Sequence, residues 1–270
     1  MSDLAAMGAT PAWALLALTL PRVEEAWLED FARGFSVLAR EHEVALVGGD
    51  TTRGPLMINV QLLGFVPAGQ GLRRSGASPG DLLCVSGTPG DAAAGLKYIR
   101  ESDLRSSSSA PALADAWRTL QRRFEYPTPR VDLGRYLATI ASACIDVSDG
   151  LAGDIDKMLA ASRCAAIIEI DALPRSGALG ALVATGTLSR HEALRLTLGG
   201  GDDYELAFCV PAARRATLDE LLRQGAVSLI GEIVVLENSA TARLGFRSSR
   251  PGEALSELLE TSAGFDHFAV

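Results

Sequence analysis

The chain has 270 residues, a length that fits two domains or one large one. Hydrophobic residues make up 48% and charged residues 21%, a globular balance that excludes disorder, collagen and coiled coil. The formal net charge of -8 disfavours electrostatic binding to duplex DNA, so we expect no nucleic-acid partner.

The first residues have to be distinguished from a membrane anchor, because residues 4–20 carry no charge. Pro11 interrupts the stretch, and Asp3 stands where a signal peptide carries basic residues. We therefore predict a short helix over 3–7, a buried strand over 13–20 and a soluble protein without membrane contact. The four cysteines lie far apart among apolar neighbours with no CxxC spacing, which predicts buried free thiols in the cytoplasm.

The next elements follow from hydrophobic periodicity. Apolar residues three and four apart from Trp27 to Leu38 predict an amphipathic helix. Residues 44–47 predict a buried strand that runs into a glycine turn at 48–50. Alternation over 56–66 predicts a half-buried strand, and the Gly, Pro and Ser content of 68–80 is typical of a linker.

The second half alternates predicted strands and helices. We therefore predict an α/β (α+β) fold with two domains, residues 1–67 and 81–270. The predicted strands are 82–86, 144–147, 165–170, 204–210 and 227–233. Two predicted helices start at 91 and 148, and two more cover 112–124 and 130–142. The serine run at 105–110 is a predicted loop.

Carboxylates at the ends of apolar runs are the first candidates for chemistry. They are Asp3, Asp50, Asp146 and Asp149. Each has a simpler explanation, since Asp149 or Ser148 could cap a helix and Asp50 could be a turn residue. Four such positions together favour a divalent-metal site with oxygen ligands, and we expect the four side chains to converge.

Further candidates lie in two short segments. Residues 199–206 repeat the glycine–acid pattern, which fits a solvated turn equally well, and the Arg73–Arg74 pair could hold an anion or be solvated surface. Lys97 and Lys157 are the only lysines, and the P-loop, G-x-G-x-x-G, G-x-S-x-G and HExxH patterns are absent.

Six segments in order resemble the thiamine-monophosphate kinase family, whose superfamily includes aminoimidazole-ribonucleotide synthetase and selenophosphate synthetase. They are SDLAAMGA from Ser2, VGGDTT from Val47, RSGA-x-PGD from Arg74, IDVSDGL from Ile145, GGDDYEL from Gly200 and GFDHF from Gly264. The resemblance implies a two-domain fold like that of aminoimidazole-ribonucleotide synthetase, with the first domain pairing in a homodimer. It implies Mg²⁺-dependent transfer of the ATP γ-phosphoryl group to thiamine monophosphate.

The resemblance also implies roles for individual residues. Asp3, Asp50, Asp146 and Asp149 match Mg²⁺ ligands, while Gly49, Asp50, Arg74 and Ser148 match nucleotide contacts. Asp202 and Phe265 match substrate contacts, although the family usually has Glu at the position of Asp202. An acceptor that is itself a phosphate needs no general base, so catalysis would be alignment and charge neutralisation by Mg²⁺ and Arg74.

One departure from the family concerns the start of the chain. The family begins earlier, with a glycine-rich stretch and a Gly-Asp-Asp motif, so we expect the first domain to be incomplete and the chain alone to self-associate and show little activity. Two other functions stay open: a related purine-pathway synthetase that uses ATP, and a catalytically silent nucleotide-binding module.

Overall fold

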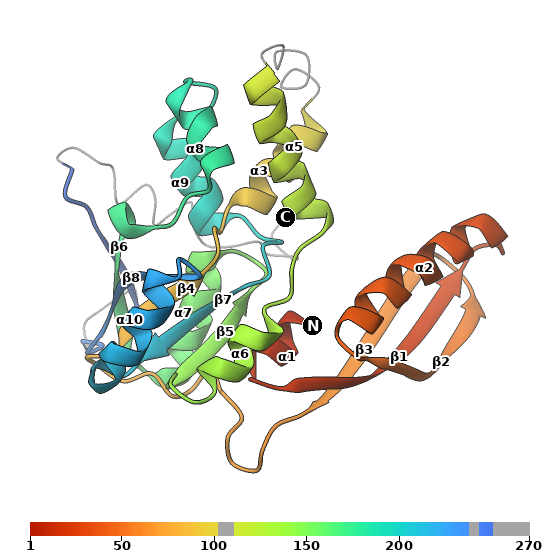
Figure 1. The fold of residues 1–270 in the computed structure, drawn as a ribbon, viewed down its shortest axis with the longest axis horizontal. Coiled ribbons are helices and arrows are strands. Elements are labelled where there is room, and N and C mark those ends of the chain that lie inside the picture. The colour runs from red at the N-terminus through yellow and green to blue at the C-terminus, as the bar shows by residue number, and fades with distance from the viewer. Residues whose placement is uncertain (102–110, 238–242, 251–270) are drawn as a thin grey trace.

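The computed structural model describes residues 1–101, 111–237 and 243–250, which form two separate sheets. The first sheet has the order β2-β1-β3. Its central strand β1 (Thr10–Leu20) pairs in parallel with β2 (Ala45–Arg53) and antiparallel with β3 (Met57–Phe65). Helix α2 (Glu25–Glu41) runs along it, and this N-terminal sheet projects away from the rest of the molecule (Figure 1).

The two faces of the N-terminal sheet differ in cover. Ala14 and Leu18 of β1 are buried on the face where α2 lies, while Ile58, the β3 partner of Leu18, is 44% exposed on that face. The opposite face, which we call the open face, carries Trp13 and its partner Leu63, both exposed. Strand residues alternate between faces, so every second residue of all three strands lies on this uncovered side.

Three expectations for this region are wrong, and one of them is the half-buried strand over 56–66, because every residue of β3 except Leu62 is exposed. The segment Gly48-Gly49-Asp50 is no turn but continues β2, and residues 44–47 are not buried, since Leu46 and Val47 are 52% and 56% exposed. The apolar run predicted a buried strand, but β2 is an edge strand of a projecting sheet and no element of the described chain covers it.

The second sheet has six strands in the order β5-β7-β4-β8-β6-β9. Neighbours are antiparallel except β6 and β9, so the alternation of helices and strands does not produce a parallel sheet here. The strands are β4 (Leu82–Ser86), β5 (Ala143–Val147), β6 (Ala165–Glu169), β7 (Glu205–Val210), β8 (Val227–Val234) and β9 (Leu244–Arg247).

Helices cover both faces of this six-stranded sheet. On one face α7 (Leu151–Ser162) buries Ile155, Met158 and Leu159 in the main core. The other face holds a second core with α1 (Ser2–Ala6), α6 (Val131–Leu137) and α10 (Arg215–Arg223). Short 3-10 turns cover Ile170–Ala172 and Ala212–Arg214.

Four further helices stand together beyond one end of this sheet (Figure 1). They are α3 (Asp91–Arg100), α5 (Pro111–Glu125), α8 (Gly177–Ala184) and α9 (Arg190–Gly199). Buried Trp117 stacks on Tyr98 in their shared core, with ring centroids 4.9 Å apart. The predicted mixture of helices and strands is confirmed, but α8, α9, α10 and β9 were not anticipated, and the helix expected over 130–142 ends at Leu137.

Helix α1 links the start of the chain to the six-stranded sheet. Ala5 and Ala6 are buried against α6 and β5, and a Cβ at Gly134 would lie 2.0 Å from the Ala5 carbonyl oxygen. The first residues therefore pack against the second half of the chain, although the sequence alone assigns them to the first domain.

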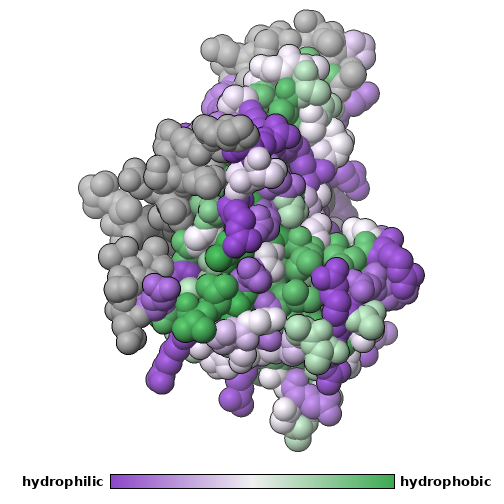
Figure 2. All heavy atoms as spheres, turned by 90° about the vertical axis from the view of Figure 1, so that its left-hand side faces the viewer, coloured by the Kyte–Doolittle hydropathy of each residue, from purple (hydrophilic) through white to green (hydrophobic). Residues whose placement is uncertain are grey.

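The surface on the side away from the N-terminal sheet mixes hydrophilic and hydrophobic residues (Figure 2). In the described ranges, no helix combines the length and the apolar character that crossing a bilayer demands.

Candidate functional site

Asp146 lies on β5 and is buried, with an exposed fraction of 6%. The Ser2 hydroxyl donates a hydrogen bond to its Oδ2 over 2.7 Å. Burial raises the pKa of Asp146, the Ser2 hydrogen bond lowers it, and the nearby Asp3 raises it again. Helix α1 thus brings two of the predicted carboxylates, Asp3 and Asp146, close to each other.

A cavity of about 230 Å³, here called the Asp146 cavity, opens beside this pair. Arg73 and Arg74 also line it, so the linker contributes two arginines to the wall that carries the two carboxylates. The linker is fixed there by its backbone: the Arg73 carbonyl accepts the Cys144 N–H at 3.0 Å, and the Arg74 carbonyl accepts the Ser162 hydroxyl at 2.8 Å.

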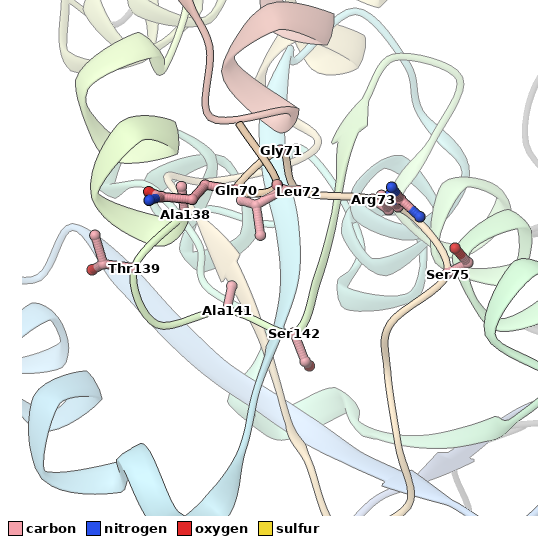
Figure 3. A pocket seen from close by; sticks show the side chains of 10 residues that line it. Gln70, Gly71, Leu72, Arg73, Ser75, Ala138, Thr139, Ala141 and Ser142 are labelled. Atoms are coloured by element: carbon pink, nitrogen blue, oxygen red, sulfur yellow. The ribbon is translucent and has the colours of Figure 1, made fainter. Parts of the chain in front are cut away.

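Arg73 also lines a neighbouring cavity of about 470 Å³ between the linker and the turn that follows α6 (Figure 3). Its other lining residues are small or neutral, namely Gly69, Gln70, Gly71, Leu72, Ser75, Ala138, Thr139, Ala141 and Ser142. No carboxylate lines this second cavity, so the Asp146 cavity is the better candidate for a metal or phosphate site.

A larger cavity of about 650 Å³, here called the Tyr204 cavity, lies between the end of β5, the loop 199–204 and α3. Ser148 and Asp149 line it from β5, and Asp202 and Tyr204 line it from the loop. The α3 wall consists of Ala93, Leu96, Lys97, Arg100 and Glu101; Leu196 and the glycines 199–201 complete the lining.

Tyr204 and Asp202 form a hydrogen-bonded pair on the wall of the Tyr204 cavity. The Tyr204 hydroxyl donates to Asp202 Oδ1 over 3.3 Å. Burial raises the pKa of Tyr204 most, followed by the charge of Asp202, and Asp146 and Asp149 raise it further. Asp146 lines one cavity, and Ser148, two residues further along the chain, lines the other, so both cavities draw on the end of β5.

The start of α7 shows whether Ser148 or Asp149 caps this helix. Neither side chain caps the helix. Instead, Asp154 Oδ2 accepts the N–H groups of Ser148 and Asp149 at 2.9 and 3.0 Å. The Asp149 carboxylate accepts the Lys157 ammonium at 2.6 Å, and Asp154 accepts it at 2.9 Å. The Asp149 carboxylate therefore pairs with the Lys157 ammonium and does not cap the helix.

Asp50 is not where convergence predicts it. It lies on β2 opposite Ala17, on the open face of the projecting sheet, and its Oδ1 accepts the Thr51 N–H at 2.8 Å. In the described ranges, no three His, Cys, Asp or Glu side chains are close enough to hold one metal ion. The expected convergence of four carboxylates in one chain is wrong, because β2 is the far edge of a sheet that stands apart from β5.

Gly49 shares the location of Asp50. Its φ of 150° leaves no room for a side chain, since a Cβ would lie 1.8 Å from the Leu16 carbonyl oxygen. Phe265, the other expected substrate contact, lies outside the described residues, as does the serine run 105–110. All four cysteines fall within the described residues, where they are free and buried, as expected.

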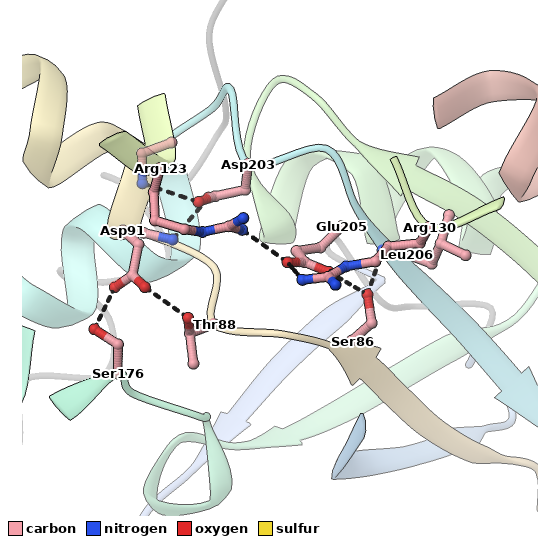
Figure 4. Close-up of polar contacts among 11 residues, drawn as sticks. Ser86, Thr88, Asp91, Arg123, Arg130, Ser176, Asp203, Glu205 and Leu206 are labelled. Atoms are coloured by element: carbon pink, nitrogen blue, oxygen red, sulfur yellow. Dashed lines mark hydrogen bonds and ion pairs between the residues drawn. The ribbon is translucent and has the colours of Figure 1, made fainter. Parts of the chain in front are cut away.

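Sequence reasoning missed a buried ionic cluster behind the Tyr204 cavity (Figure 4). Glu205 is fully buried and accepts hydrogen bonds from Arg123 at 2.8 Å, from Arg130 at 2.5 and 2.6 Å, and from the Ser86 hydroxyl at 2.5 Å. An acid that begins an apolar strand signals such a cluster, since a buried charge has to be paired.

Two protein-family models together match most of the chain. Residues 1–66 match the N-terminal domain of AIR synthase related proteins, and residues 78–241 match the C-terminal domain of the same family. The thiamine-monophosphate kinase of Salmonella typhimurium is 48% identical over 83% of this chain and 66% of its own length. The thiamine-monophosphate kinase of Escherichia coli K12 is 44% identical over 100% of this chain and 78% of its own length.

Solved structures agree with these sequence matches. The crystal structure of a thiamine-monophosphate kinase from Stenotrophomonas maltophilia K279a has a TM-score of 0.80 at 43% identity, covering 91% of this chain and 74% of that one. AaThiL complexed with AMPPCP and TMP has a TM-score of 0.75 at 28% identity, covering 92% of this chain and 72% of that one.

Proposed function

The chain belongs to the thiamine-monophosphate kinase family of AIR synthase related proteins, a family of enzymes, and from this we propose that it transfers the γ-phosphoryl group of ATP to thiamine monophosphate. The proposed product is thiamine diphosphate. The observation that carries the proposal is the pair of acidic cavities at the end of β5, one lined by two arginines and one large enough for a small organic phosphate.

We propose Mg²⁺ as the ion that makes this acidic site usable. The donors present, Asp3 and Asp146, are carboxylates, and Mg²⁺ is commonly held by one or two carboxylates with water and phosphate oxygens completing the shell, so the pair fits. Asp149 is a further candidate ligand beside them. When bound, the ion would neutralise phosphate oxygens and stabilise charge during transfer.

Arg74 and Ser148 are the proposed nucleotide contacts of this half of the chain. Arg74 lines the Asp146 cavity, where its guanidinium could bind phosphate oxygens in place of the absent P-loop lysine. Ser148 lies at the end of β5, on the wall of the Tyr204 cavity. Gly49 and Asp50 would complete the nucleotide site from the N-terminal sheet.

The Tyr204 cavity is the proposed site of thiamine monophosphate. AaThiL has been solved in complex with both AMPPCP and TMP, which supports sites for two ligands in this fold. Thiamine carries a cationic ring, and Asp202 with the Tyr204 ring supplies a carboxylate and an aromatic face for a cation. Phe265 is retained as a proposed substrate contact.

Phosphoryl transfer here requires alignment more than proton transfer. The acceptor phosphate is ionised near neutral pH and is already a nucleophile. The residues of the two cavities would hold donor and acceptor in line and offset their mutual repulsion. We assign no general base.

We further propose that the protein works as a homodimer paired through the open face of the N-terminal sheet. That face leaves Trp13, Met57 and Leu63 at 43%, 62% and 38% exposure, and such apolar surface favours a second copy as cover. Pairing would also enclose Asp50, which lies on the same face. The reduced cysteines and the use of ATP favour a cytoplasmic location.

A coupled ADP-release assay tests the proposal. The chain is incubated with ATP, Mg²⁺ and thiamine monophosphate, and the product is identified by chromatography. Thiamine serves as control acceptor, because it offers a hydroxyl instead of a phosphate. ADP release without thiamine diphosphate formation, or equal use of thiamine, contradicts the proposed reaction.

A further inference from the structure

We propose that Asp203 is the positioning residue of the acceptor site: its buried carboxylate ties the loop 199–204 to helix α3 and so fixes Asp202 and Tyr204 in the Tyr204 cavity. The inference rests on the proposed function and goes beyond it, because Asp203 itself does not line that cavity.

The side chain of Asp203 makes the link to α3. It is fully buried, and its two oxygens accept the backbone N–H groups of Gly90 at 2.7 Å and Ala92 at 3.1 Å (Figure 4). These N–H groups belong to the first turn of α3, where a helix has donors without partners of its own. One carboxylate therefore joins the loop to the helix that forms the opposite wall of the cavity.

The backbone of the loop makes a second link, to β5. The N–H of Asp202 donates to the Ser148 carbonyl at 2.9 Å, and the N–H of Tyr204 donates to the Val147 carbonyl at 2.8 Å. The backbone on either side of Asp203 is thus hydrogen-bonded to β5, while the Asp203 side chain is hydrogen-bonded to α3. Asp203 is therefore the residue of the loop whose side chain joins the β5 wall of the cavity to the α3 wall.

The conformation of the neighbours shows why such an anchor is needed. Asp202 and Tyr204 have φ values of 67° and 51°, in the left-handed region that side chains other than glycine rarely adopt. Residues in this region persist only where surrounding contacts hold them there. The two strained residues carry the side chains in the cavity, while Asp203 and Glu205, which alternate with them, are both buried and bonded.

The chemistry of Asp203 argues against a purely structural purpose. Placing a carboxylate away from water is costly, and two neutral N–H donors offset only part of that cost. A neutral residue would fill the space with less desolvation. The carboxylate is the group that can accept both N–H bonds at once, and those bonds set the position of the loop.

The test compares Asp203→Asn with a matched control, Asp91→Asn. Asp91 is also buried at the start of α3, but its carboxylate accepts the hydroxyls of Thr88 and Ser176, neither of which belongs to the loop. For Asp203→Asn, we expect the KM for thiamine monophosphate to rise about tenfold or more, with the KM for ATP changing within about twofold. Asp91→Asn should change neither KM by more than about twofold.

Calorimetric binding of thiamine monophosphate and melting curves accompany the kinetics, and all assays run below the lowest melting temperature. Asp203→Glu, which keeps the charge and moves it by one methylene, carries the comparison if Asp203→Asn does not fold. An acceptor KM that rises equally in the Asp91 variant, or stays unchanged in both Asp203 variants, overturns the inference. A wild-type chain that does not bind thiamine monophosphate overturns the proposed function instead.

Discussion

Ser2 and Asp146 are 144 positions apart, yet the Ser2 hydroxyl donates to the Asp146 carboxylate over 2.7 Å in a buried contact. Through this bond the first helix of the chain reaches the central acid of the site. Asp3 follows directly and faces the same cavity. The contact makes the N-terminal helix part of the site as well as of the core.

Ser2→Ala tests the value of this contact. The substitution leaves a buried carboxylate with one donor fewer, so we expect the free energy of unfolding to fall by about 1–2 kcal/mol. We also expect weaker Mg²⁺ binding, because Asp146 loses the group that helps to keep it ionised. Urea denaturation and calorimetry measure the two effects. Thr119→Ala, which removes an exposed hydroxyl on α5, is the control, and an equal loss there would contradict this expectation.

Arg74→Ala should weaken ATP binding by about 1.5–3 kcal/mol, the range for hydrogen bonds to charged groups. The reason is the position of Arg74 in the Asp146 cavity. Titration calorimetry with AMPPCP and Mg²⁺ gives the value. Arg118→Ala removes an exposed arginine of α5 and controls for the change in net charge. Unchanged affinity in Arg74→Ala would make Arg74 a surface residue.

Removing Mg²⁺ should lower ATP affinity by about tenfold or more, since Asp3 and Asp146 repel the phosphates without a cation between them. The comparison is calorimetry with Mg²⁺ against EDTA. Asp146→Asn should bind ATP with a smaller difference between the two conditions. Equal affinity with and without EDTA in the wild type would show that no metal mediates binding.

Mixed dimers can show how Asp50 reaches the site. Asp50 and Asp146 lie apart in one chain, so we expect Asp50 of one copy to serve Asp146 of the other. Asp50→Asn and Asp146→Asn should each be inactive alone. After mixing under exchange, one intact site in each mixed dimer should restore about a quarter of wild-type activity. No recovery, with subunit exchange verified by mass, would place both residues in the same chain's site.

Stability should depend on pH through Asp203. Burial raises the pKa of Asp203 from the usual 3.8 to about 7, although the hydrogen bonds from Gly90 and Ala92 lower it in part. The folded chain then binds this proton more tightly than the unfolded chain, so the contribution favours folding at low pH. It is lost as the pH rises from about 4 to about 7.

The wild type should therefore lose unfolding free energy relative to Asp203→Asn over that window, by up to about 1.4 kcal/mol per pH unit. Urea denaturation of both chains at several pH values between about 4.5 and 7.5 supplies the comparison. Parallel profiles of the two chains would show that Asp203 is ionised throughout.

Much of the secondary structure follows from the sequence because buried strands appear as short apolar runs. The strand expected over 82–86 is β4 to the residue, and the helix expected from 91 is α3. The same reasoning failed for residues 44–50. A local apolar run indicates that a segment will be buried, but it does not indicate which part of the protein will bury it. In the single chain, β2 lies exposed at the edge of a projecting sheet.

Residue types and their local spacing were enough to predict the family and the kinds of chemical group that the site contains. Ordered motifs identify the family, and acids at strand ends indicate oxygen chemistry, because these depend only on residue type and local spacing. Which of the acidic side chains lie close together depends on the tertiary structure. Asp3 joins Asp146 because α1 packs on β5, whereas Asp50 stays on a separate sheet. The role of Asp203 was likewise invisible, since a motif does not distinguish the acid that faces a cavity from the buried neighbour that holds it there.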